Sequence, residues 1–431
     1  MCYPSTLRPR ALAACLLALS SFSHAAQPAL GFEDALRLAQ ERSRQLVAQD
    51  AASAAAREMA VAAGQRPDPT LKAGINNLPI DGPDQFSLSR DFMTMRSIGL
   101  MQELTREDKR KLRSARFERE AEVAQAGRDL ALTKLQRNTA LAWLDRFFLG
   151  RVRSLLVEQR AEAQLQVEAA LAAYRGARGA QADIFAARSV VAQIEDRIAQ
   201  AERQIESATI VLVRWVGEAG RTELGAPPVM DNVRLHAQAL DAQLLGHPEI
   251  AMMARQEQVA QADANIAQAD RRADWSVEFM ASQRGPAYSN MVSLNFSLPL
   301  QWRREQRQNR ELAAKLATVQ QMRAEREETT REHLAETQSV LLEWQSNRER
   351  LVRYDSTLIP LASERTRAAT AAYRGGTGTL KMVLDGRRDE ADVRAERLRL
   401  EMDTARLWAQ LNFLIPAGHL AASPATGGKA P

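Results

Sequence analysis

The 431-residue sequence has few residues that carry chemistry by themselves. Its 2 cysteines, Cys2 and Cys15, both lie in an N-terminal segment that we expect to be removed. A mature chain without cysteine excludes disulfides, thiolate metal sites, iron–sulfur clusters and cysteine nucleophiles. Aromatic residues make up only 5% of the chain, whereas alanine, leucine, glutamine, glutamate and arginine are abundant. This composition favours long helices over a large globular core.

A strong charge of one sign and a long apolar run are also missing. The 58 basic and 53 acidic residues give a mixed-charge surface, not the basic excess of a nucleic-acid-binding protein. The sequence contains no uninterrupted run of about 18 apolar residues, so it predicts no transmembrane helix. Phosphate-binding glycine loops and nucleophile elbows are absent as well. We therefore expect a protein that is not an enzyme and has no cofactor.

Histidine gives no metal motif. Apart from Glu332 beside His333, we find no ligand-like array of histidine with another histidine or an acid, and we expect no metal site. The five histidines are His24, His236, His247, His333 and His419.

The N-terminus has the three parts of a secretory signal peptide, which we assign to residues 1–25. Arg8 and Arg10 precede an apolar stretch over residues 11–22, and small residues follow at the cleavage site near Ala25. Lipidation at Cys15 is the alternative. It is disfavoured because only four apolar residues precede that cysteine, whereas an apolar signal region needs about 7–15.

The rest of the chain contains one unit twice. The pentapeptide AAYRG at residues 172–176 recurs at residues 371–375, and such internal repetition decides architecture. The unit reads helix, strand, strand, long helix, tight turn, helix. The resulting division is a first repeat at 31–216 with a hairpin at about 68–104, a linker at 217–244, a second repeat at 245–416 with a hairpin at about 274–300, and a disordered tail at 417–431.

Long helices are predicted between the strands and turns. In residues 194–212 apolar side chains recur at alternating steps of three and four, as in lengthwise packed coiled coils. Leu334, Thr337, Leu341 and Trp344 show the same spacing. The predicted helices are Glu33–Gly64, Thr105–Tyr174, Asp183–Val216, Arg303–Tyr373 with a kink at Pro360, and Arg387–Leu414.

Four short segments alternate apolar and polar residues: 71–76, 97–100, 275–282 and 292–300. Alternation over about 9–11 residues is typical of outer-membrane strands, although a soluble half-buried hairpin gives the same pattern. The smallest outer-membrane barrels have about eight strands, so a membrane role needs several copies, of which three would supply about 12 strands. Trp275 and Trp302 lie at the same end of the second hairpin, as membrane-interface aromatics do, or as two unrelated surface tryptophans.

The signal peptide, the repeated unit and its hairpins together resemble the TolC-like outer-membrane efflux proteins over residues 31–418. Residues 99–104, followed by Lys109 and Arg110, are similar to the heavy-metal, CzcC-like branch, although Thr105–Arg110 replaces the Pro–Gly–Lys junction usual there. The resemblance implies a mainly α fold with a small β part. It also implies a homotrimer with a 12-stranded barrel in outer-membrane lipid, continued by a helical barrel through the periplasm.

Such a protein is a passive exit duct that docks onto a periplasmic adaptor and an inner-membrane pump, here of the RND type. The resemblance assigns the adaptor contacts to the two turns between long and return helices. Glycine permits tight reversal there, and Ala177 stands where the second turn has Gly376. The turn residues are Tyr174, Gly176, Ala177, Gly179, Tyr373, Gly375, Gly376 and Thr377.

The resemblance also implies a gate at the periplasmic tip, with Asp183 hydrogen-bonding Tyr373 of a neighbouring repeat. Gly378 stands at the position of the arginine that completes this gate in the family, with Arg374 or Arg178 as possible replacements. Asp183 has a second interpretation as an ordinary acid in the first turn of a helix, where aspartate is favoured anyway.

Three functions remain open from the sequence. The first is an efflux duct for heavy metals, other cations or drugs. The second is an exit duct for type I protein secretion. The third belongs to another class, a periplasmic structural coiled-coil protein with two soluble hairpins.

Overall fold

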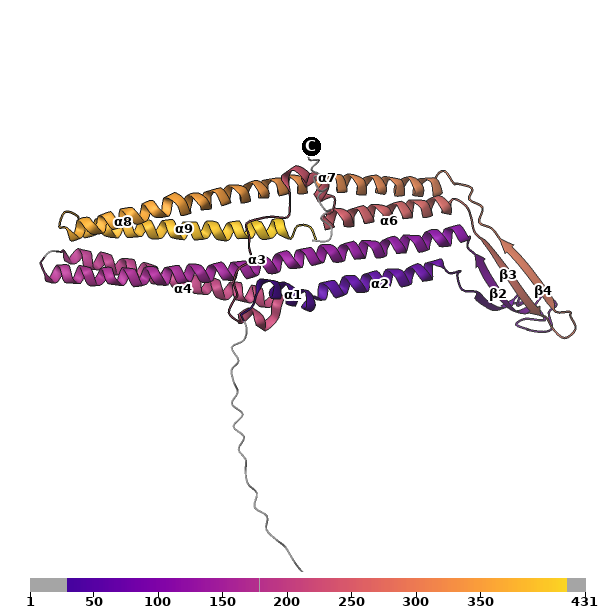
Figure 1. Ribbon diagram of the computed structural model, residues 1–431. Coiled ribbons are helices and arrows are strands. Elements are labelled where there is room, and N and C mark those ends of the chain that lie inside the picture. The colour runs from indigo at the N-terminus through magenta and orange to yellow at the C-terminus, as the bar shows by residue number, and fades with distance from the viewer. Residues whose placement is uncertain (1–28, 178, 417–431) are drawn as a thin grey trace, which may run out of the picture.

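The computed structural model describes residues 29–177 and 179–416. The predicted signal peptide and the predicted disordered tail lie outside these residues, as does Arg178. The described chain is elongated, with long helices side by side and a small sheet at one end. Two tight turns, each joining two helices, lie at the other end (Figure 1).

The first half begins with two helices, α1 (Phe32–Arg42) and α2 (Arg44–Gly64). The prediction of one continuous helix over 33–64 is therefore wrong at Ser43. This residue has an extended backbone, and its Oγ accepts a hydrogen bond from Leu46 N at 3.4 Å, which makes it the N-cap of α2. A serine whose side chain binds a nearby backbone N–H favours a helix start over a helix interior.

The longest helix, α3 (Glu107–Arg175), runs for 69 residues without a break and so spans about 100 Å. Helix α4 (Gln181–Val216) returns beside it after a tight turn. The predicted seam of α4 is confirmed, because Ile194, Ile198 and Ala201 are buried in a cluster with Leu156 and Ala163 of α3.

The second half repeats this order with one interruption. It contains α6 (Pro248–Asp270), α7 (Gln308–Arg353), α8 (Ile359–Arg374) and α9 (Leu380–Asn412). A π-helical turn, Tyr354–Leu358, separates α7 from α8 just before Pro360. Proline lacks the N–H that would continue the α-helical ladder, which explains a break at this point.

Helix α9 begins earlier than predicted, at Leu380 instead of Arg387. Thr379 caps it, because its Oγ1 accepts a hydrogen bond from Met382 N at 3.4 Å. Gly386 lies inside the helix, and its carbonyl accepts a hydrogen bond from Thr366 Oγ1 of α8 at 2.9 Å. This hydrogen bond joins α8 to α9.

Between the halves, residues 217–244 form short helical turns: η1 (Gly217–Arg221), η2 (Ala237–Ala239) and α5 (Leu240–Leu244). Leu224 makes an isolated parallel bridge with Leu30, which ties this segment to the start of the first half. Among the residues described, no helix combines the length and apolar character needed to cross a membrane.

The strands are β1 (Thr70–Asn76), β2 (Met95–Leu104), β3 (Trp275–Gln283) and β4 (Met291–Ser297). They form one antiparallel sheet in the order β1-β2-β3-β4. The central pair, β2 and β3, joins the two halves of the chain. Strands β1 and β4 are the edges of this sheet, and each has one neighbour in the described chain.

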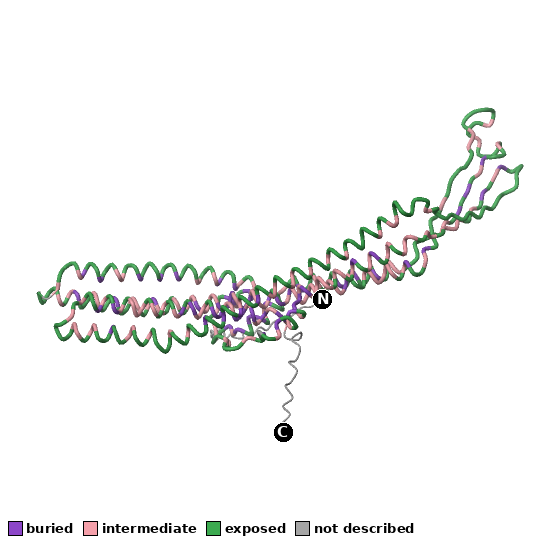
Figure 2. Tube along the Cα trace, turned by 90° about the horizontal axis from the view of Figure 1, so that it is seen from above, coloured by how far each residue is buried: buried purple, intermediate pink, exposed green. Residues whose placement is uncertain are grey.

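The main core lies near the middle of the long helices, where buried positions gather in Figure 2. Trp143, Leu144 and Phe148 of α3 are fully buried there, together with Leu212 of α4. Phe32 of α1 meets Trp143 edge-on, with ring centroids 5.5 Å apart. Toward both ends many of the buried residues are alanines, and an alanine side chain buries less apolar area than a larger one.

Candidate functional site

The strand register lines up apolar side chains across the whole sheet. Residues directly opposite on paired strands point to the same face. Each of the four residues in one such row keeps between 53% and 65% of its surface exposed. This row is Leu71, Leu100, Phe279 and Leu294. A second exposed row is Ala73, Ile98, Ala281 and Val292. We call this surface the apolar sheet face.

The other face of the sheet is polar. Ser97 lies opposite Ser282, and both are buried. Asn76 Nδ2 donates to Ser97 Oγ at 2.9 Å, and Lys72 Nζ lies 3.1 Å from Glu278 Oε1. The alternation predicted from the sequence is thus confirmed as an amphipathic sheet, with its apolar side turned to the surroundings.

The two predicted interface tryptophans lie at the end of the sheet that adjoins the helices. Trp275 opens β3, directly opposite Leu104 at the end of β2. Trp302 follows β4 and precedes α7. They are 51% and 84% exposed. Their common end agrees with the sequence, and their membrane role stays a prediction.

The two predicted adaptor turns lie at the opposite end of the molecule (Figure 1). The two turns share a backbone hydrogen bond and a residue with positive φ. Gly176 N and Gly375 N donate to Ala172 O and Ala371 O, at 3.1 and 2.9 Å. Ala177 and Gly376, one residue later, have positive φ values of 54° and 76°. Ala177 therefore adopts a left-handed conformation that glycine adopts at lower cost.

This difference between the turns predicts opposite effects of two substitutions. Ala177→Gly should raise the free energy of unfolding by about 0.5–1 kcal/mol, and Gly376→Ala should lower it by about 1 kcal/mol. Apart from the two adjacent residues, no atom of the described chain lies within 4 Å of a Cβ placed on Gly376, so the cost of this substitution comes from the backbone. Urea unfolding of both variants checks the pair, and effects of the same sign would contradict it.

The last glycine of each turn packs on the preceding helix. A Cβ on Gly179 would lie 3.1 Å from Ala173 Cβ, and one on Gly378 would lie 3.0 Å from Ala372 Cβ. Thr377 N also donates to Ala372 O at 3.0 Å, which closes the second turn. Both turns are therefore compact, and their outer residues are largely exposed, including Tyr174 at 48%.

The proposed gate residues are not joined within the chain. Asp183 lies in the first turn of α4, and its Oδ2 accepts a hydrogen bond from Ala180 N at 3.1 Å, so its alternative role at a helix start is present. Tyr373 lies in the last turn of α8, and no hydrogen bond links it to Asp183 among the described residues. Lys381 of α9 lines the same cavity as Asp183. The sequence did not draw attention to that lysine.

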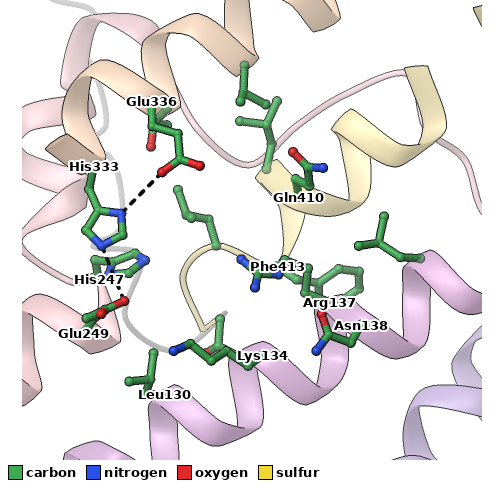
Figure 3. Close-up of a pocket in the computed structure, with 16 residues that line it drawn as sticks. Leu130, Lys134, Arg137, Asn138, His247, Glu249, His333, Glu336, Gln410 and Phe413 are labelled. Atoms are coloured by element: carbon green, nitrogen blue, oxygen red, sulfur yellow. Dashed lines mark ion pairs between the residues drawn. The ribbon is translucent and has the colours of Figure 1, made fainter. Parts of the chain in front are cut away.

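The structure brings together one cluster that the sequence analysis missed. His247 and His333 have ring centroids 4.3 Å apart, and Glu249 and Glu336 are beside them (Figure 3). Burial, followed by the nearby His333, Arg137 and Lys134, lowers the pKa of His247 to about 4. The expectation that histidine forms no array is wrong here. Glu336, three residues after His333 on one helix face, was an available signal.

No family model and no curated protein matches this chain. Several solved structures share its fold. CusC, whose structures concern transmembrane channel formation, has a TM-score of 0.76 at 16% identity over 96% of this chain and 99% of its own. The outer-membrane channel OprN has a TM-score of 0.74 at 15% identity over 89% and 90%. The MtrE outer membrane channel of Neisseria gonorrhoeae has a TM-score of 0.70 at 17% identity over 89% and 88%.

These similarities define a class of fold: the chain is built like outer-membrane channels, mostly helical with a small antiparallel sheet. The structures named are channels, not enzymes. The fold expected from the sequence resemblance is thereby confirmed at this level.

Proposed function

We propose that this protein is the outer-membrane exit duct of a tripartite efflux pump and works as a homotrimer. The observation that carries the proposal is the apolar sheet face together with the two edge strands. In lipid, backbone N–H and C=O groups have no water to bind, so a sheet inserted there must close. Pairing β1 of one copy with β4 of the next satisfies both edges, and three copies give a barrel of about 12 strands.

Strand length supports this arrangement. Strands β2 and β3 have 10 and 9 residues, close to the roughly 9–11 residues of a membrane-spanning strand. Trp275 and Trp302 then lie at the lipid boundary nearest the helices, as interface aromatics do. The helices extend from that boundary through the periplasm, and the two turns lie at the far tip.

In this arrangement the tip turns contact a periplasmic adaptor, which connects the duct to an inner-membrane pump of the RND type. The similarity of residues 99–104 to the CzcC-like branch favours heavy-metal or other cation efflux over drug efflux. The duct itself is passive, because the described residues hold no nucleotide-binding motif and energy comes from the pump.

Crosslinking through the two edge strands tests the trimer. With Ala73→Cys on β1 and Val292→Cys on β4, a bis-maleimide should yield linked species of up to three chains from outer-membrane fractions. Ala73→Cys alone is the matched control, because one edge cannot join a closed ring. A mature protein that is monomeric and soluble without detergent would contradict the proposal and favour the structural coiled-coil alternative.

The gate has its own prediction. Replacing Asp183 with alanine and Tyr373 with phenylalanine should raise single-channel conductance or vancomycin sensitivity. One hydrogen bond of about 1 kcal/mol corresponds to a roughly fivefold change in the ratio of open to closed states. Because Asp183 also binds Ala180 N, loss of a helix cap needs a control. Thr379→Ala removes the cap of α9 at the same tip and should leave conductance unchanged. An increase in conductance in Thr379→Ala as large as that in the Asp183 and Tyr373 variant would exclude the gate.

A further inference from the structure

Two histidines and a glutamate from separate helices converge near the middle of the molecule. His247 is the residue before α6, Glu249 lies in the first turn of α6, and His333 lies on α7. One ligand atom from each residue lies within 4.8 Å of the others. Figure 3 shows the three side chains pointing toward one another beside a cavity.

The spacing of the donor atoms suits a small metal ion. His333 Nε2 lies 3.5 Å from Glu249 Oε2. Two ligand atoms at about 2 Å from a tetrahedral zinc ion are roughly 3.3 Å apart. The separation of this His333–Glu249 pair is therefore close to that of two zinc ligands.

His247 supplies an independent observation. Only 5% of its surface is exposed, and its Nδ1 has no hydrogen-bond partner in the described chain. Buried polar atoms usually have a partner, and an exception calls for a physical explanation. A metal ion bound by the imidazole provides one.

A carboxylate stands behind the second histidine. His333 Nδ1 lies 4.0 Å from Glu336 Oε2, on the side of the ring away from Glu249. A histidine that binds metal through one nitrogen commonly donates its other N–H to a carboxylate, which fixes the ring. Glu336 can act in this way as a positioning residue.

The surrounding charges and access are compatible with a cation. The cavity of about 330 Å³ is also lined by Lys134 and Arg137 of α3, which repel a cation. The carboxylates of Glu249 and Glu336 offset these two charges. The side chains of His333 and Glu249 are 19% and 34% exposed, so an ion can reach the site from solvent.

We infer that His247, Glu249 and His333 bind a divalent transition-metal ion, with zinc as the expected ion. Two imidazoles and one carboxylate form a zinc ligand set, and the absence of a thiolate disfavours copper(I). Water completes the coordination. The ion joins α6 to α7, so it stabilises their packing as a resident structural ion.

Titration of the full-length protein, purified without a histidine tag and stripped of metal, tests this inference. Calorimetry with zinc chloride should show a single site per chain. Glu249→Gln and His333→Gln should each weaken binding by at least about tenfold, and Glu336→Gln by about ten- to a hundredfold. His236→Gln removes an exposed histidine and is the matched control, which should bind as the unchanged protein does.

Cobalt(II) gives a second readout. A tetrahedral site should produce strong visible absorption that Glu336→Gln shifts and His236→Gln leaves unchanged. The test uses no His247 variant, because His247 is buried and its replacement would also affect folding. Zinc affinity equal in the unchanged protein and in His333→Gln, or an equal loss in His236→Gln, would overturn the inference. The trimer crosslinking experiment is unaffected by either result.

Discussion

Replacing Trp143 with alanine is expected to lower the free energy of unfolding by about 3–5 kcal/mol, the range for large aromatic residues removed from a core. Trp143 has 0% of its surface exposed. Its ring stacks on Phe147 at 5.3 Å between centroids and meets Phe32 edge-on. Its Nε1 donates to Leu30 O at 3.1 Å. Removal leaves a cavity where α1 and α3 meet. The other buried apolar cluster found among the described residues is much smaller.

Urea unfolding of the purified protein in detergent measures this loss. Trp302→Ala is the matched control, because it removes the same side chain from a position that is 84% exposed. We expect its unfolding midpoint to stay close to that of the unchanged protein. Similar losses for the two variants would show that the buried cluster does not dominate stability.

Replacing Lys109 with methionine is expected to lower the free energy of unfolding by about 3 kcal/mol, at the low end of the range for breaking a buried ion pair. Its side chain is 4% exposed, and its Nζ lies 2.7 Å from Asp274 Oδ2 and 3.2 Å from Asp270 Oδ1. Asp274 is only 14% exposed, so its charge loses its main partner. It keeps a hydrogen bond from Arg106 N at 3.2 Å, which limits the cost.

This ion pair connects the start of α3 to the segment between α6 and β3, where the helices join the sheet. Adding Asp274→Asn to Lys109→Met should recover part of the lost stability, because it removes the uncompensated charge. Lys111→Met is the control. The Lys111–Glu107 pair, with a separation of 2.7 Å, is 74% and 69% exposed, and we expect no measurable change. Thermal unfolding in detergent compares the three variants.

Local patterns predicted most of the elements. The uninterrupted helix α3 followed from the lack of proline between Thr105 and Tyr174, and the amphipathic strands followed from strict alternation. The misplaced boundaries have local causes that compete with periodicity. Ser43 caps a helix within an otherwise helical pattern, and Thr379 starts α9 before its apolar pattern is clear.

The candidate site was predicted unevenly. The turns were found because the AAYRG segment occurs twice, and the structure adds the left-handed backbone shared by Ala177 and Gly376. The histidine cluster was missed because His247, just before α6, and His333, on α7, lie far apart in the sequence. Only the packing of α6 beside α7 brings their rings to 4.3 Å.

The repeat, the helix and strand periods and the glycine-containing turns can be predicted without tertiary information, because each depends on residues close together in the chain. Tertiary structure alone decided that β2 pairs with β3, that Asp274 receives Lys109, and that two histidines meet. The first two contacts join the two repeats, and the third joins two segments of the second repeat. No local pattern specifies contacts between segments far apart in the chain.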